Sequence, residues 1–141
     1  MLAFTTRIPL AVMIAMGIKQ WENRSAMPSP ACGQCGMTCS KSSDVREYAN
    51  FLAWAKQVFP EEVFSVLPQW EQVADWRGKM IAVCDYNASY TPGPPIWNEW
   101  YSVWWHLTNV KMLREPIPCR GNVGMWGLPD EITQQLKKLM K

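Results

Sequence analysis

The short apolar run at residues 79–85 (KMIAVCD) constrains the fold more than any other segment. Seven residues that follow a glycine are too few for a typical helix, so the run predicts a buried strand. Residues 101–108 (YSVWWHLT) alternate between apolar and more polar positions, which predicts a half-buried strand. In that strand we expect Trp105 to be buried with Leu107, and Trp104 and His106 to be exposed or to line a cleft.

Three helices are expected around these strands. The first follows a strand at Leu2–Thr6, begins near Pro9 and ends at Gly17, because glycine tolerates the left-handed conformation found after helices. The second is capped by Asp44 and extends to about Val58. The apolar faces are expected to carry Val45, Tyr48, Leu52 and Ala55 in the second helix, and Ile132, Leu136 and Leu139 in a C-terminal third helix.

Prolines, glycines and short alternating runs define the remaining elements. Further strands or extended segments are expected at residues 19–24, 35–39, 110–113 and 125–128. Turns are expected at residues 27–30, 91–95 and 116–118, and one short helix at residues 60–78. This order predicts an α+β fold: residues 1–141 form a single domain, a mixed and partly closed β-barrel with flanking helices.

The composition narrows the class of protein. No apolar run reaches the roughly 18 residues of a membrane-spanning helix, so we expect no membrane partner. The apolar stretch at residues 7–17 leads directly into a patterned segment without a cleavage site, so we expect no signal peptide. A net charge of +2 is small for a nucleic-acid-binding protein, which means that any such site must be local.

The five cysteines raise the question of disulfides or a metal. Five is an odd number, so reduced thiols are the simpler interpretation, and with them a cytoplasmic location. Cys32, Cys35 and Cys39 are spaced closely enough for zinc, but a second C-x2-C pair is missing. We therefore expect buried thiols, and neither a metal nor a cofactor.

A series of motifs follows a fixed order along the chain. Residues 3–11 (AFTTRIPLA) precede Gly17, Lys19, Glu22 and Arg24, which fit the pattern G-x-K-x-x-E-x-R at all four fixed positions. Next come residues 32–41 (CGQCGMTCSK), a pair of prolines at 116 and 118, and residues 121–128 (GNVGMWGL). From about residue 2 to residue 128 the chain thus resembles an ASCH domain (activating signal cointegrator homology) of the PUA-like superfamily.

The chain also departs from the ASCH pattern. The family's opening motif resembles A-L-S-I-R-Q-P-W-A, and Ile8 and Leu10 stand here for its Gln and Trp. The family's next strand resembles R-G-P-L-A-I-H-A-S-K, and Cys32 and Thr38 stand for its Arg and His. The resemblance implies a PUA-like barrel whose cleft is lined by the G-x-K-x-x-E-x-R residues and by the strand that ends in Ser-Lys.

Three functions follow from the resemblance and the residues. The first is binding of RNA, single-stranded DNA or a modified nucleotide in a cationic cleft, with Trp104 as a stacking ring. The second is an amidohydrolase for an acylated nucleoside such as N4-acetylcytidine, with Lys19 and Glu22 as the catalytic pair, although Glu22 stands where such enzymes have Thr. The third is a protein-interaction module that uses the Trp- and Pro-rich loop at residues 90–100. The expected ligand contacts are Arg7, Lys19, Glu22, Arg24, Ser40, Lys41 and Trp104.

Three of these residues also have a structural interpretation. Glu22 and Arg24 lie two residues apart and would share one face of a strand, where an ion pair between them would fix that strand. Lys41 would then be an ordinary solvated lysine after a buried strand. If the binding role holds, replacing Lys19 or Arg24 by alanine weakens binding and leaves the fold intact.

Overall fold

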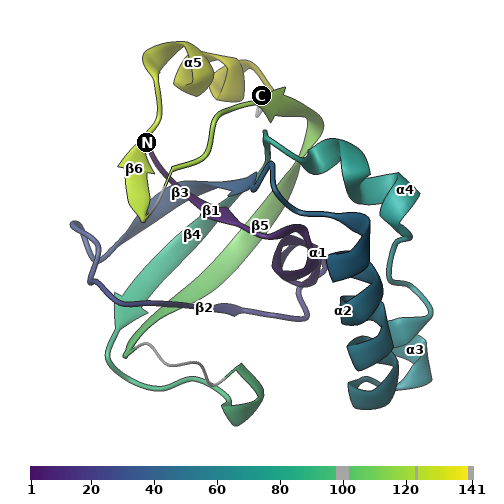
Figure 1. Cartoon of the computed structure of the whole chain (residues 1–141). Coiled ribbons are helices and arrows are strands. Elements are labelled where there is room, and N and C mark those ends of the chain that lie inside the picture. The colour runs from purple at the N-terminus through teal and green to yellow at the C-terminus, as the bar shows by residue number, and fades with distance from the viewer. Residues whose placement is uncertain (98–101, 123, 140–141) are drawn as a thin grey trace.

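The fold is a curled six-stranded sheet with helices around it, as the computed structural model in Figure 1 shows for residues 1–97, 102–122 and 124–139. The strand order is β2-β5-β4-β3-β1-β6; β1 runs parallel to β3, and all other neighbours are antiparallel. The sheet curls into a half-barrel, with β2 and β6 as its edges. The strands are β1 (Leu2–Thr6), β2 (Trp21–Arg24), β3 (Cys32–Cys39), β4 (Lys79–Ser89), β5 (Val103–Pro118) and β6 (Met125–Gly127).

The predicted α+β class with a partly open, barrel-like sheet is confirmed. The buried run at residues 79–85 lies in β4, which occupies the middle of the sheet between β3 and β5. Trp105 and Leu107 are buried, as the alternation predicts. No helix in the described part of the chain combines the length and apolar character needed to cross a membrane.

The prediction of a turn at residues 116–118 is wrong, because these residues continue β5. Ile117 pairs with Met80 and Pro118 pairs with Lys79, which makes β5 one strand of 16 residues. The pairing shifts register between Met80 and Ala82, and Pro116 falls in that irregular stretch. Proline is tolerated at such places because they do not require its missing N–H.

The helices lie around the curled sheet (Figure 1). In Figure 1, α1 packs beside β1 with α2, α3 and α4 beyond it, while α5 lies at the opposite end near β6. The segment at residues 60–78 forms several short helices where one was expected. The helices are α1 (Ile8–Ala15), α2 (Val45–Val58), α3 (Glu61–Phe64), α4 (Trp70–Val73) and α5 (Asp130–Leu139), with single 3-10 turns η1 (Ala74–Trp76) and η2 (Pro95–Trp97).

Gly17 stops helix α1, two residues after its last residue, as the sequence predicts. The Ile18 amide donates to the Met13 carbonyl at 2.9 Å and the Gly17 amide donates to the Ile14 carbonyl at 3.1 Å, which is a Schellman ending. Gly17 has a φ of 75°, a conformation that glycine adopts without steric cost. This ending turns the chain sharply from α1 toward β2.

Helix α2 begins as predicted, but its buried face is rotated from the expected one. Asp44 caps the helix by accepting a hydrogen bond of 2.8 Å from the Glu47 amide. The buried side chains are Tyr48, Phe51 and Ala55, whereas Leu52 is half-buried and Val45 is exposed.

The expectation that Trp104 is exposed or lines a cleft is wrong. Its side chain is only 4% exposed, because the Trp21 ring packs edge-on against it at 6.2 Å and the loop after β4 covers both rings. A Cβ at Gly93 would lie 2.7 Å from the Trp21 ring and 2.9 Å from the Trp104 ring, so only glycine fits this contact. On the other face of β5, Trp105 packs inside the half-barrel against Phe4 and Tyr86 at 5.9 and 6.0 Å.

Candidate functional site

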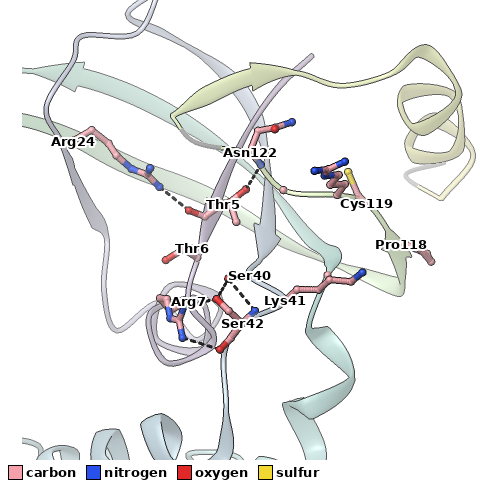
Figure 2. A pocket seen from close by; sticks show the side chains of 13 residues that line it. Thr5, Thr6, Arg7, Arg24, Ser40, Lys41, Ser42, Pro118, Cys119 and Asn122 are labelled. Carbon is pink, nitrogen blue, oxygen red and sulfur yellow. Dashed lines mark hydrogen bonds between the residues drawn. The ribbon is translucent and has the colours of Figure 1, made fainter.

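A cleft of about 1120 Å³ opens beside the end of β1. Its walls come from the junction of β1 and α1, the loop between β3 and α2, the end of β2, and the segment that follows β5 (Figure 2). The residues that line it are Thr5, Thr6, Arg7, Arg24, Ser40, Lys41, Ser42, Gly78, Pro118, Cys119, Arg120, Gly121 and Asn122.

The cleft concentrates positive charge on a protein that has little overall. Three arginines and one lysine line it, and none of its described lining residues is acidic. Thr5, Thr6, Ser40 and Ser42 add hydroxyl groups to the same walls. Clustered cations in a concave site focus the electric field and attract anions, even when the net charge is only +2.

Arg7 is a fixed cation that shapes the cleft. Its guanidinium donates to both carboxylate oxygens of Glu47, at 2.8 and 3.0 Å, and to the hydroxyl and carbonyl of Ser42 at 2.6 and 3.0 Å. The bond to Glu47 is also the main reason that the pKa of Arg7 is raised. Because Glu47 offsets most of its charge, Arg7 serves chiefly to hold the β3–α2 loop against β1, as Figure 2 shows.

The β3–α2 loop presents Lys41 to the cleft. The Ser40 amide donates to the Thr6 carbonyl at 2.8 Å, and the Ser40 hydroxyl accepts from the Ser42 amide at 3.2 Å. The Ser43 hydroxyl accepts from the Ile8 amide at 3.0 Å. Lys41 is exposed between these anchors, and no ion pair or hydrogen bond engages its ammonium within the described residues.

Arg24 closes the cleft from the end of β2. Its Nη2 donates to the Thr5 carbonyl at 2.9 Å and lies 3.6 Å from Glu22 Oε2. The guanidinium also lies over the rings of Phe4 and Trp105, at 5.7 and 5.5 Å from their centres. The ion pair expected between Glu22 and Arg24 is confirmed, and the hydrogen bond from Arg24 to the Thr5 carbonyl links β2 to β1.

Arg120 and Asn122 complete the far wall. The Cys119 amide donates to the Gly78 carbonyl at 3.0 Å, and the Asn122 amide donates to Thr5 Oγ1 at 3.2 Å. A Cβ at Gly121 would lie 2.6 Å from the same Thr5 oxygen, so a glycine is needed for this segment to lie against β1. Arg120 is exposed, and nothing in the described ranges pairs with its guanidinium.

Sequence reasoning missed Arg120 and Asn122. The sequence carries no local signal for them, because only the close approach of Gly121 to Thr5 shows that this segment faces the cleft.

The structure brings four of the expected ligand contacts together. Arg7, Arg24, Ser40 and Lys41 all line this one cleft, although they are up to 34 residues apart in sequence. Glu22 does not line the cleft, but it lies directly behind Arg24.

Lys19 and Trp104 lie away from the cleft. Lys19 is 1% exposed; its ammonium donates to the Trp21 carbonyl and lies 5.6 Å from the centre of the Trp97 ring. Trp104 is buried on the face of the sheet that carries Trp21. The structure therefore places Lys19 within the packing that joins α1, β2 and the loop after β4.

The Trp- and Pro-rich loop is partly described. Trp97 is 8% exposed and packs toward Phe59, whereas Tyr90 and Ile96 are 66% and 50% exposed. Residues 98–100 of the proposed interaction loop lie outside the described residues.

The thiols are positioned within the core, except for Cys32, which is exposed. Cys35 and Cys84 pair across β3 and β4 with their sulfur atoms 3.6 Å apart, and burial raises the pKa of Cys39 to about 12. In the described ranges, no three His, Cys, Asp or Glu side chains gather closely enough to hold a metal ion.

No protein-family model matches the chain, and no curated protein matches it either.

Proposed function

We propose that this chain is an ASCH-type, PUA-like domain that binds RNA, single-stranded DNA or a modified nucleotide through the cationic cleft. The observation that carries the proposal is the cleft itself: four cations and four hydroxyl residues line about 1120 Å³ of space, with no described acidic residue among them. Phosphate is the anion that such a site suits best, because arginine forks, ammonium groups and hydroxyls all donate to its oxygens.

The cations divide into two kinds. Arg7 and Arg24 are held in place by hydrogen bonds to other residues, so they form preorganised walls. Lys41 and Arg120 are exposed and extend from short anchored segments, so their charges remain available to a ligand. Two available charges predict modest affinity for single strands, with a slope of log affinity against log salt of about −1.4.

Replacing Lys41 or Arg120 by alanine tests this function. Each change is expected to weaken binding of a fluorescently labelled single strand by roughly 1–2 kcal/mol, because each removes one phosphate contact. Each should also reduce the slope of log affinity against log salt by about 0.7. Fluorescence anisotropy at several salt concentrations measures both quantities.

Lys111→Ala and Arg114→Ala provide matched controls, because both residues are exposed on β5 and neither lines the cleft. If the controls weaken binding as much as the cleft variants do, the cleft is not the binding site.

A hydrolase is the second candidate, and one observation favours it. Glu22 is 4% exposed, and its Oε2 has no hydrogen-bond partner among the described residues, although Arg24 lies 3.6 Å away. A buried carboxylate next to a substrate-binding cleft is suited to moving protons. On this proposal Lys19 acts by holding the base of β2, since its ammonium donates to the Trp21 carbonyl.

Chromatographic detection of cytidine released from N4-acetylcytidine tests the hydrolase. Release by the intact protein and its loss in Glu22→Gln are expected, with that variant's circular dichroism spectrum unchanged. No release above the rate in protein-free buffer would contradict hydrolysis and leave the binding proposal standing.

A protein partner at residues 90–100 is the third candidate, supported by the exposed side chains of Tyr90 and Ile96. Apolar docking would change little with salt, whereas phosphate binding weakens measurably as the salt concentration rises. The salt series described above therefore also distinguishes these two functions.

A further inference from the structure

A second pocket lies at the open side of the half-barrel. It measures about 430 Å³, within the range of roughly 300–1,000 Å³ found for small-molecule sites. It opens between the segment that leaves β2 and the segment that enters β6. Strands β2 and β6 are the two edges of the sheet in Figure 1. Its walls are mainly apolar and include Leu2, Met27, Pro28, Trp105 and Met125.

This apolar pocket and the cationic cleft meet at one residue. Arg24 lines both, and its guanidinium bridges the open side of the half-barrel to the Thr5 carbonyl. The same guanidinium lies over the Phe4 and Trp105 rings. A ligand that filled both spaces would need an anionic group on one side of Arg24 and a compact, largely apolar group on the other.

Among the described residues, five buried side-chain polar atoms have no hydrogen-bond partner, and two of them lie beside this junction. They are Glu22 Oε2, an acceptor, and Trp105 Nε1, a donor. Glu22 and Trp105 are directly opposite each other in the β2–β5 pairing, so their side chains share the inner face of the sheet. Because buried polar atoms are normally paired, a matched acceptor and donor left open together indicate a partner that brings one donor and one acceptor.

We propose that the apolar pocket takes the base of an unpaired nucleotide whose phosphate lies in the cationic cleft. This inference rests on the proposed function and specifies its ligand. A nucleobase is flat and largely apolar on its faces, and its edge carries donors for Glu22 and acceptors for Trp105. In a duplex that edge is already paired, so the site takes a single-stranded or flipped-out nucleotide, or a free mononucleotide.

Arg24 has a defined part in this binding mode. Its guanidinium lies over the Trp105 ring, and a base reaches the two open atoms when that guanidinium gives up its contact with Glu22 while its hydrogen bond to the Thr5 carbonyl keeps it in the wall of the cleft. Arg24 then exchanges its contact with Glu22 for a contact with the phosphate, and the base edge takes its place beside the carboxylate.

The test uses four probes in a fluorescence competition assay: a short single strand, the same strand made wholly of abasic sites, the strand annealed to its complement, and free nucleoside monophosphates. We expect the intact strand to bind roughly tenfold more tightly than the abasic strand, the effect of one well-held base. The duplex is expected to bind like the abasic strand. Displacement by a mononucleotide shows that one nucleotide is sufficient, and its absence shows that the nucleotide must be part of a strand.

Two variants connect the preference to the pocket. Ala26→Phe fills the pocket from an exposed position, and Trp105→Phe removes the indole donor; each is expected to bring the intact and abasic affinities within about threefold of each other. Trp126→Phe is the control, because its indole Nε1 is also buried and has no hydrogen-bond partner in the described part of the chain, but Trp126 does not line the pocket. Ala26→Phe gives the result even if Trp105→Phe does not fold.

The outcomes distinguish this inference from the function on which it rests. Equal affinity for the intact and abasic strands, with both weakened by Lys41→Ala, overturns the base pocket and leaves the phosphate cleft standing. Retention of the tenfold preference in Ala26→Phe also overturns the base pocket. Failure of every probe to bind overturns the proposed function itself.

Discussion

Arg24→Ala is expected to lower the free energy of unfolding by about 3 kcal/mol. The change leaves the Glu22 carboxylate, 4% exposed, without its counter-ion in the interior of the half-barrel. Removing one partner of a buried ion pair costs about 3–5 kcal/mol, and the lower end applies because the Arg24 side chain is 23% exposed and the pair is 3.6 Å apart. The sequence alone predicts an intact fold for this variant, and the burial of Glu22 is the reason to expect otherwise.

The double variant Arg24→Ala/Glu22→Gln isolates the ion pair. Because Gln carries no charge, the double variant is expected to be more stable than Arg24→Ala by roughly 1–2 kcal/mol in urea denaturation. Additive effects of the two changes would show that the pair contributes no coupling and that Arg24 acts through packing alone.

Raising the pH from 9 to 12 is expected to lower the free energy of unfolding, because buried acids, Cys39 and Tyr48 among them, resist ionisation. Burial raises the pKa of Cys39 from 9.0 to about 12 and that of Tyr48 from 10.0 to about 12. In the unfolded chain these groups lose their protons at their ordinary pKa values, so between pH 9 and 12 the unfolded state binds fewer protons than the native state. Stability therefore falls as the pH rises through this window, by about 3–4 kcal/mol for Cys39 and about 2–3 kcal/mol for Tyr48.

Cys39→Ala and Tyr48→Phe each remove one of these contributions. Both are expected to be less stable than the unmodified protein at pH 7, through lost packing and through the lost hydrogen bond from the Tyr48 hydroxyl to the Pro68 carbonyl. Between pH 9 and 12, the free energy of unfolding of each variant should nevertheless fall by less than that of the unmodified protein. Met37→Leu is the control: its site is buried on the same strand as Cys39 and does not ionise, so its pH profile should be shifted but parallel. Parallel profiles for all three variants would contradict the assignment.

The elements that sequence predicted best are those fixed by local chemistry. Gly17 ends α1 and Asp44 begins α2 because a left-handed glycine and a side-chain cap act within one turn of the chain. The central strand was predictable because residues 79–85 have no polar face to expose. These signals depend on neighbours in sequence and not on the tertiary fold.

The errors arose where tertiary contacts overrule the local pattern. Trp104 occupies the more polar face of an alternating strand, yet the Gly93 loop covers it together with Trp21. Pro116 and Pro118 look like a turn, but an irregular register in β5 accommodates them. Neither the covering loop nor the register shift can be inferred from the residues that they affect.

The residues of the cationic cleft were predictable only in part. Arg24 and Lys41 were expected because the motifs that contain them resemble a known pattern, and the curl of the sheet brings them to one cleft. Lys19 belongs to the same motif but is turned into the core by the Schellman ending of α1. Arg120 was missed because only the approach of its glycine neighbour to Thr5 shows that it faces the cleft.

Nuclear magnetic resonance titration tests the central claim most directly, because it locates the ligand on the protein. Backbone amide shifts are followed while a short single strand is added at low salt. Our account predicts that the largest shifts occur at cleft residues such as Lys41, Ser42 and Asn122, and that the amides of Lys137 and Lys138 on α5 stay unchanged. Shifts confined to α5 or to the loop at residues 90–97, with none at Lys41 or Asn122, would contradict it.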